Sequence, residues 1–168
     1  MEMTYVTTEF AGAVRHTEEQ TVPFLPDEGR EVQLINLYPQ HTYQTFDGFG
    51  GAITESAAYI YSLMDQAQKA ELMHTYFGRE NMKYRFVRIP IDSCDFSLSH
   101  YEADGDEQDG EFRHFSFARM EQYILPMLDD AEQSYGGKLD IMLSPWSPPA
   151  YMKTNGERNH GGKLKPCY

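Results

Sequence analysis

The sequence contains little cysteine, which limits the kinds of site that it can form. Cys94 and Cys167 are the only two among 168 residues. Two isolated cysteines are too few for a disulfide framework or a thiolate metal site, so we interpret both as ordinary reduced residues. The six histidines show no HExxH spacing, which is the spacing typical of a helical zinc site. We therefore expect no metal and no cofactor.

Basic residues are also scarce. Lys and Arg number 14 against 26 Asp and Glu, which gives a formal net charge of -12. Nucleic acids and anionic membrane surfaces attract basic patches, so the composition argues against both as partners. No apolar run is long enough to span a bilayer. The N-terminal MEMTYVTTEF lacks the basic and apolar regions of a signal peptide, so we expect a cytoplasmic protein, or a secreted one if a leader lies outside this sequence.

Two common ligand-binding loops are absent as well. The glycines of FDGFGG (46–51) lack the third glycine and the following acidic residue of the dinucleotide fingerprint. The acidic segment 101–111 fails as a calcium loop, because Asp109 stands where a glycine is needed and Phe115 where a glutamate is needed. We interpret this segment as a solvated surface loop.

The pattern of apolar residues predicts an α/β fold in a globular chain that is 40% hydrophobic. Residues 1–31 mix polar and acidic side chains, and we expect them to be loosely ordered. The order strand, helices, strand, helix, strand then indicates parallel βα units with right-handed crossovers. We expect strands at 32–38, 44–54, 83–91 and 139–143, the last buried on both faces, and helices at 55–64, 65–77 and 117–135, the last kinked or divided by Pro126.

Prolines end the last predicted strand and present the only tryptophan. Segment 144–149, SPWSPP, cannot continue a β ladder, so Trp146 is expected in a stiffened loop. Its indole face suits the apolar C–H face of a sugar ring, and a tryptophan that plugs the core is the alternative. Ligands of parallel sheets bind at the carboxyl ends of the strands. Because Thr54, Asp92 and Asp95 also fall there, we favour a ligand-facing role for Trp146.

Three segments are similar to one known family. FDGFGGAITESAA (46–58), VRIPIDSCDFS (87–97) and LSPWSPPAYMKTNG (143–156), followed by GGKLKP (161–166), resemble in sequence and in order the N-terminal part of glycoside hydrolase family 30. The resemblance covers residues 34–168. The family includes glucosylceramidases and bacterial relatives that act on other β-linked sugars.

The resemblance implies a TIM (β/α)8 barrel accompanied by a β-sandwich side domain. Residues 32–40 would supply a strand of the side domain, and residues 41–168 about the first three βα units of an incomplete barrel. A complete barrel usually needs about 250 residues, so its missing half would come from a longer chain or from a second chain. An incomplete barrel leaves strand edges and apolar faces open to water, and we expect poor solubility or self-association.

The resemblance also assigns two substrate-binding residues for a carbohydrate or glycolipid. Glu55 stands where glucosylceramidases have an aspartate that binds glucose hydroxyls, and Trp146 matches the tryptophan beside the sugar. Glutamate is one methylene longer than aspartate, which leaves the choice of sugar open. Two further departures are Tyr151, where many members have tryptophan, and Cys167, where an acidic residue is expected.

The resemblance places no catalytic residue in this chain. Retaining glycosidases need two carboxylates about 5 Å apart. In this family the acid/base glutamate follows an asparagine after the fourth strand, and the nucleophile ends the seventh. No Asn-Glu pair occurs in the sequence, so both glutamates are expected beyond residue 168. We expect a fragment of a retaining, glucosylceramidase-like hydrolase of glycans or glycosphingolipids, inactive alone; the alternative is a non-catalytic carbohydrate-binding or vestigial fragment.

Asp92 and Asp95 are not expected to replace the catalytic pair. They lie three residues apart on one strand and its turn, so they face opposite sides. We expect Asp95 instead to accept backbone N–H bonds that fix its loop. Arg88 alternates with Val87 and Ile89, so in a barrel it would point inward and need a carboxylate partner.

Overall fold

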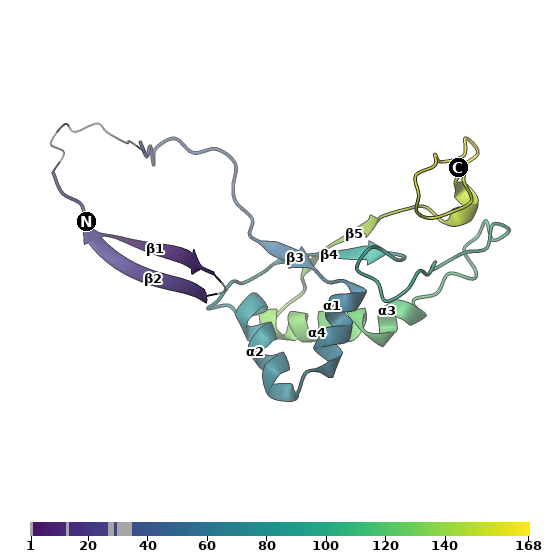
Figure 1. Cartoon of the computed structure of the whole chain (residues 1–168), viewed down its shortest axis with the longest axis horizontal. Helices are drawn as coiled ribbons and strands as arrows, with labels where there is room; N and C mark the ends of the chain where they lie inside the picture. Colours follow the sequence, from purple (N-terminus) through teal and green to yellow (C-terminus); the bar gives the residue numbers. More distant parts are fainter. Residues whose placement is uncertain (1, 13, 27–28, 30–34) are drawn as a thin grey trace. The chain divides into compact units, whose positions relative to one another are not determined.

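The computed structural model describes residues 2–12, 14–26, 29 and 35–168. The chain forms two compact units, residues 1–44 and 45–168, and each is described by itself (Figure 1). The boundary between them falls at the start of the predicted extended run 44–54. The second unit holds every parallel strand and every helix that the structure describes.

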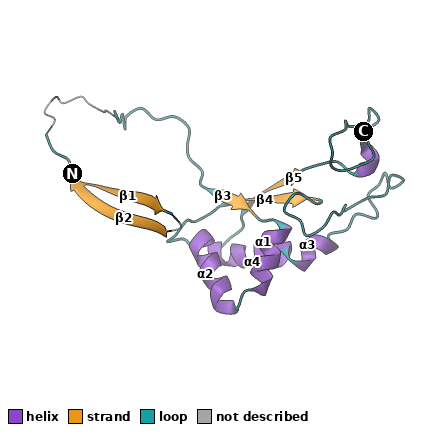
Figure 2. Cartoon of the chain, viewed as in Figure 1, coloured by secondary structure: helices purple, strands orange, loops and turns teal. Residues whose placement is uncertain are grey.

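The first unit contains an antiparallel hairpin. Strand β1 (Glu2–Ala11) pairs with β2 (Val14–Pro23) along its whole length (Figure 2). Gly12 lies at the turn with a φ of 63°, in the left-handed region that glycine adopts without a steric penalty. Residues 1–31 are expected from the sequence to be loosely ordered, and this expectation is wrong for the two strands.

The physical reason for that error is the composition of the hairpin. Every residue of β1 is exposed, so the strand carries no buried apolar face that periodicity could detect. Cross-strand contacts are polar: the hydroxyl oxygens of Thr4 and Thr21 lie 3.2 Å apart, and those of Thr8 and Thr17 lie 3.3 Å apart. Such pairs contribute roughly 0.2–1 kcal/mol each.

The predicted strand at 32–38 is not found in the described part of the chain. Residues 32–34 lie outside the described residues, and residues 35–38 have no regular secondary structure. The assignment of residues 32–40 to a side β-domain therefore stays a prediction.

The second unit is built on a parallel sheet in the order β3-β4-β5. The strands are β3 (Gly50–Ala52), β4 (Phe86–Ile91) and β5 (Asp140–Pro145). A Cβ on Gly50 would lie 2.0 Å from the backbone oxygen of Phe86, so glycine is required where β3 meets β4. The three predicted parallel strands are confirmed, although β3 is shorter than the predicted run and β5 continues through Ser144 and Pro145, which were expected to end it.

Two helices follow β3, namely α1 (Glu55–Leu63) and α2 (Gln66–Phe77). Thr54 caps α1, because its side chain accepts a hydrogen bond from the Ala57 N–H at 3.4 Å. Asp65 and Gln68 form a capping box at the start of α2, with bonds of 2.9 and 3.0 Å. Both helices are confirmed as predicted.

The predicted long helix is divided. It forms α3 (Ala118–Gln122) and α4 (Ile124–Tyr135), which meet at Tyr123. Pro126 falls in the first turn of α4, where a missing N–H breaks no intrahelical bond, so the break precedes the proline as expected. A short 3-10 helix, Ala150–Met152, follows β5.

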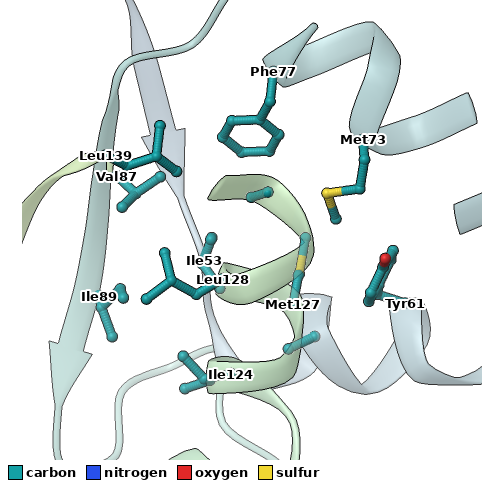
Figure 3. Packing of buried hydrophobic residues seen from close by; sticks show 12 residues of the cluster. Ile53, Tyr61, Met73, Phe77, Val87, Ile89, Ile124, Met127, Leu128 and Leu139 are labelled. Carbon is teal, nitrogen blue, oxygen red and sulfur yellow. The ribbon is translucent and has the colours of Figure 1, made fainter. Parts of the chain in front are cut away.

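The helices pack on one face of the sheet. Figure 2 shows α1, α2 and α4 on the same side of β3, β4 and β5, and in Figure 3 the α4 side chains Ile124 and Leu128 lie beside Val87 and Ile89 of β4. Full burial of such a side chain contributes about 1.5–3 kcal/mol. The core comprises Ile53, Ala58, Tyr61, Met73, Phe77, Val87, Ile89, Ile124, Met127, Leu128, Ala131 and Leu139.

The outer strand β5 is poorly covered. Ile141 and Leu143 lie opposite Val87 and Ile89 in the ladder and so share the helix-bearing face, yet they are 45% and 56% exposed. Met142, on the other face, is 58% exposed. The prediction that this strand is buried on both faces is wrong, because no described helix covers it. The sheet also does not close into a barrel within the described residues.

Candidate functional site

The carboxyl ends of the three parallel strands meet at one edge of the sheet, which is where ligands of such sheets bind. An open pocket of about 560 Å³ lies there. One wall is the loop after β4, and the other comes from the segment after β5. The pocket is lined by Ser93, Cys94, Asp95, Ser97, Leu98, Ser99, His100, Trp146, Ser147, Arg158 and Asn159.

Trp146 lies directly in this pocket and is 40% exposed. The ring of Phe96 meets it edge-on at 6.5 Å between centroids. The guanidinium carbon of Arg88 lies 5.1 Å from the centroid of the Trp146 ring. The tryptophan therefore contacts Phe96 and Arg88 while part of its surface faces solvent, and it does not belong to the hydrophobic core of the described residues.

The Arg88 contact corrects an expectation from the sequence. Arg88 was expected to need a carboxylate partner, but within the described residues it makes no ion pair and its partner is the Trp146 ring. A guanidinium on an indole face contributes about 0.5–1 kcal/mol at an exposed site and about 2 when desolvated. The cation is thus accommodated by an aromatic face and by its partial exposure.

Glu55 lies behind the pocket wall. Its side chain is 1% exposed and pairs with Arg119, whose Nη2 lies 2.6 Å from Oε1. Arg119 Nε also donates to Oε1 at 2.8 Å, and the Leu98 N–H donates to Oε2 at 2.8 Å. The structure therefore does not bring Glu55 into the pocket with Trp146. It fixes Leu98, which does line the pocket, and a direct sugar contact by Glu55 stays a prediction.

Arg119 extends this support along the same loop. Its Nη1 donates to Ser99 Oγ at 3.1 Å, and its guanidinium carbon lies 4.7 Å from the centroid of the Tyr101 ring. Burial, and then the negative charge of Glu55, raises the pKa of the Tyr101 phenol, while Arg119 acts in the opposite direction. The phenol therefore stays neutral at physiological pH and serves as a flat aromatic partner.

Asp92 and Asp95 have different surroundings. Asp92 adopts a φ of 62°, and its Oδ1 accepts the Ala103 N–H at 2.7 Å while its Oδ2 faces Arg158 at 3.1 Å. Asp95 lines the pocket but accepts no hydrogen bond within the described part of the chain. The expectation that Asp95 fixes its loop through backbone N–H bonds is wrong, and Asp92 makes that bond instead.

Arg158 is the residue that the sequence reasoning missed. Its side chain is only 9% exposed. Besides Asp92, it contacts Glu102 at 3.6 Å and donates from Nη2 to the carbonyls of Ser93 and Ser147 at 3.3 and 3.0 Å. Its partners lie between 11 and 66 residues away in sequence, and its own segment, GERNHGG, has the composition of a solvated loop. No local signal identifies it.

The acidic segment 101–111 is less solvated than expected, because Asp104 is only 8% exposed. Its Oδ1 accepts the Asp106 N–H at 3.0 Å, and its Oδ2 is buried without a partner among the described residues.

Across the part of the chain that the structure describes, no group of three or more His, Cys, Asp or Glu side chains is arranged to hold a metal ion. No helix in this part of the chain is both long and apolar enough to cross a bilayer.

Parallel strands, helices on one face and a pocket at the carboxyl ends define the second unit as an α/β domain built from parallel βα units. Residues 46–167 match the family described as the glycosyl hydrolase family 30 TIM-barrel domain. The chain therefore belongs to glycosyl hydrolase family 30, and the resemblance seen in the three sequence segments is confirmed.

Three relatives of this chain are longer than it is. Lysosomal acid glucosylceramidase of Mus musculus is 33% identical over 134 residues, which are 79% of this chain and 26% of that protein. The crystal structure of SrfJ from Salmonella typhimurium has a TM-score of 0.80 and 34% identity, over 99% of this chain and 37% of that one. An endo-β1,6-glucanase structure has a TM-score of 0.66 and 30% identity, over 79% and 30%. The chain thus spans 26% to 37% of these relatives.

Proposed function

We propose that this chain supplies the sugar-binding part of a retaining β-glycosidase that acts on glycans or glycosphingolipids. The observation that carries the proposal is Trp146, which is 40% exposed in the pocket at the carboxyl edge of the parallel sheet. An indole offers an apolar surface to the C–H face of a sugar, while the pocket around it carries hydroxyl, imidazole and amide groups. Relatives named as a glucosylceramidase and an endo-β1,6-glucanase support a β-linked glucoside as the substrate class.

The chemistry would be double displacement at the anomeric carbon. A nucleophilic carboxylate forms a glycosyl-enzyme while a carboxylic acid protonates the leaving oxygen, and the two groups lie about 5 Å apart. Glu55 and Asp92, which follow β3 and β4, have both oxygens engaged by partners within the chain. They are therefore poorly suited to attack a sugar. In this proposal both catalytic glutamates lie beyond residue 168, and the chain is inactive by itself.

The same proposal places the completing polypeptide beside β5. This strand pairs only with β4 in the described part of the chain, and Ile141, Met142 and Leu143 leave both of its faces apolar and exposed. Strands of parallel sheets are normally covered on both faces. A further parallel strand and its helix, from a longer chain or from a second chain, would satisfy the free edge and cover these side chains.

A non-catalytic carbohydrate-binding role is the second candidate. It is favoured by the pocket that Trp146 and the loops after β4 and β5 form within this chain, because these residues already present an aromatic face and polar groups to a sugar. The two candidates share the sugar site and differ in whether turnover follows when the barrel is completed.

The sugar site is tested with methyl β-D-glucoside and the purified chain by saturation-transfer NMR. We expect transfer to the glucoside protons from the wild-type chain and its loss in Trp146→Ala. Phe112→Ala is the matched control, because Phe112 is an exposed aromatic residue outside the pocket. Equal transfer to the wild type and to Trp146→Ala would contradict the proposed site.

A further inference from the structure

The two walls of the pocket are joined by one buried cation. Arg158 Nη1 lies 3.1 Å from Asp92 Oδ2 and 3.6 Å from Glu102 Oε1. Its Nη2 donates to the backbone carbonyls of Ser93 and Ser147. Ser93 begins the wall that follows β4, and Ser147 immediately follows Trp146 in the opposite wall. A single guanidinium thus bridges both sides of the sugar pocket.

The backbone of Arg158 is fixed as firmly as its side chain. The Arg158 carbonyl accepts hydrogen bonds from Ser147 Oγ and, at 2.8 Å, from Lys153 Nζ. Lys153 is 7% exposed, so this bond is shielded from water. Ser147 therefore binds Arg158 twice, once through its hydroxyl and once through its carbonyl, which ties the residue beside Trp146 to the cation.

The two acidic partners of Arg158 organise further backbone. Asp92 Oδ1 accepts the Ala103 N–H at 2.7 Å, and Glu102 Oε1 accepts the Ala150 N–H at 2.8 Å. Asp92 holds a left-handed φ of 62°, which costs a non-glycine residue of order 1–3 kcal/mol unless its surroundings fix it. Without the cation, two poorly solvated carboxylates would face one another, and repulsion would drive the loops apart.

We propose that Arg158 is a positioning residue that sets the orientation of Trp146 and the width of the sugar pocket by clamping the loops after β4 and β5. The planar fork of a guanidinium allows one side chain to engage carboxylates and two carbonyls in fixed directions, whereas a lysine ammonium acts as a point charge. The role of this clamp rests on the proposed function, because the pocket that Arg158 holds is the proposed sugar site. Its geometry can be tested without any sugar.

Trp146 provides the readout, because it is the only tryptophan in the chain. In Arg158→Met we expect the emission to move to longer wavelength and acrylamide to quench it more efficiently, since the loops separate and water reaches the indole. Arg158→Lys should behave like Arg158→Met because it keeps the charge without the fork. Arg113→Met is the matched control: the Arg113 side chain is 73% exposed, and its ion pair among the described residues is with Glu111, outside the pocket.

Comparison of single and double variants distinguishes a role in positioning Trp146 from a general loss of stability. Asp92→Asn should shift the emission in the same direction as Arg158→Met, and the double variant should shift no further than the larger single change, because Asp92 Oδ2 acts on the loop after β5 through Arg158. Should Arg158→Met lose its far-UV circular dichroism, Asp92→Asn decides the question alone. In the folded variants we expect binding of methyl β-D-glucoside to weaken about tenfold.

The proposed role of Arg158 would be overturned by wild-type emission and quenching in folded Arg158→Met or in Asp92→Asn. Wild-type emission in Arg158→Lys would also overturn it. So would a shift in Arg113→Met as large as that in Arg158→Met. Absence of glucoside binding by the wild-type chain would instead contradict the proposed function. The emission data would still decide whether Arg158 positions Trp146, so the two failures are distinguishable.

Discussion

The guanidinium of Arg88 lies 5.1 Å from the centroid of the Trp146 ring. Arg88 belongs to β4 and Trp146 follows β5, so the contact joins neighbouring strands near their carboxyl ends. Arg88 faces away from the core residues Val87 and Ile89. Its side chain therefore supports the tryptophan from the inner side of the partial barrel.

Replacement of Arg88 tests this contact. Arg88→Met retains much of the aliphatic length and removes the cation, and we expect loss of the near-UV circular dichroism of Trp146 with about 0.5–1 kcal/mol lower stability. Arg85→Met is the control, because Arg85 contacts Asp140 and Phe86 rather than the tryptophan. An unchanged near-UV spectrum in Arg88→Met would show that the contact does not order Trp146.

The ion pair between the buried Glu55 and the partly exposed Arg119 leads to a second prediction. Removing a charged hydrogen-bond partner costs about 1.5–3 kcal/mol, and Arg119 is 35% exposed, so water offsets part of the loss. We expect Glu55→Gln to lower the free energy of unfolding in urea by about 2 kcal/mol. Glu121→Gln, on the same short helix as Arg119 but exposed, should change it by less than about 0.5 kcal/mol.

A double-mutant cycle with Arg119→Met measures the coupling between the two charges. Residues in direct contact show interaction energies of about 0.5–3 kcal/mol. Strict additivity of the two single variants would mean that Glu55 is held by its other contacts, and that Arg119 does not anchor the loop through it.

Gly50 and Gly51 make a matched pair for the third prediction. A Cβ on Gly50 would lie 2.0 Å from the Phe86 backbone oxygen, whereas a Cβ on Gly51 meets the Tyr84 side chain at 3.3 Å. The Phe86 oxygen cannot move away, because it belongs to the backbone of the ladder, whereas the half-exposed Tyr84 ring can rotate aside. We expect Gly50→Ala to separate β3 from β4 and to cost more than about 3 kcal/mol, measured by urea unfolding. Gly51→Ala should cost less than about 1 kcal/mol, and equal losses would contradict the register of β3.

The exposed strand β5 leads to the fourth prediction. Ile141→Thr combined with Leu143→Thr should reduce self-association and the binding of a dye that reports exposed apolar surface. The chain should stay folded, because both side chains already face water. Sedimentation velocity over a range of concentrations measures the change. Ile89→Thr is the buried counterpart at 1% exposed and should instead destabilise the fold by about 2–4 kcal/mol. Unaltered association in the double variant would show that another surface drives it.

Much of the parallel unit could be predicted from sequence because its signals are local. Apolar runs mark β4 and β5, the Asp65–Gln68 capping box marks α2, and Pro126 marks the division before α4. These features depend on residues a few positions apart. The hairpin β1–β2 escaped because its cross-strand contacts are polar and its side chains are exposed.

The candidate site was only partly predictable, because its contacts join residues far apart in sequence. Trp146 was identified because a unique aromatic follows a strand that proline ends. Arg158 was missed, since its partner Asp92 lies 66 residues away. Side-chain alternation predicts that Arg88 faces inward, but it defines only a face of the strand and does not predict the contact with the Trp146 ring. Family resemblance identifies Glu55, but its pairing with Arg119 joins residues 64 positions apart, which no local pattern predicts.

The most direct test is hydrolysis of a chromogenic β-glucoside, measured for the purified chain alone and for the chain mixed with the part of the Mus musculus lysosomal acid glucosylceramidase that follows the matched region. We expect no turnover by the chain alone, no turnover by the glucosylceramidase part alone, and turnover by the mixture once the barrel is completed. Turnover by the chain alone would contradict the claim that the catalytic carboxylates lie elsewhere. A stable mixed complex that binds the glucoside without hydrolysing it would favour the non-catalytic role.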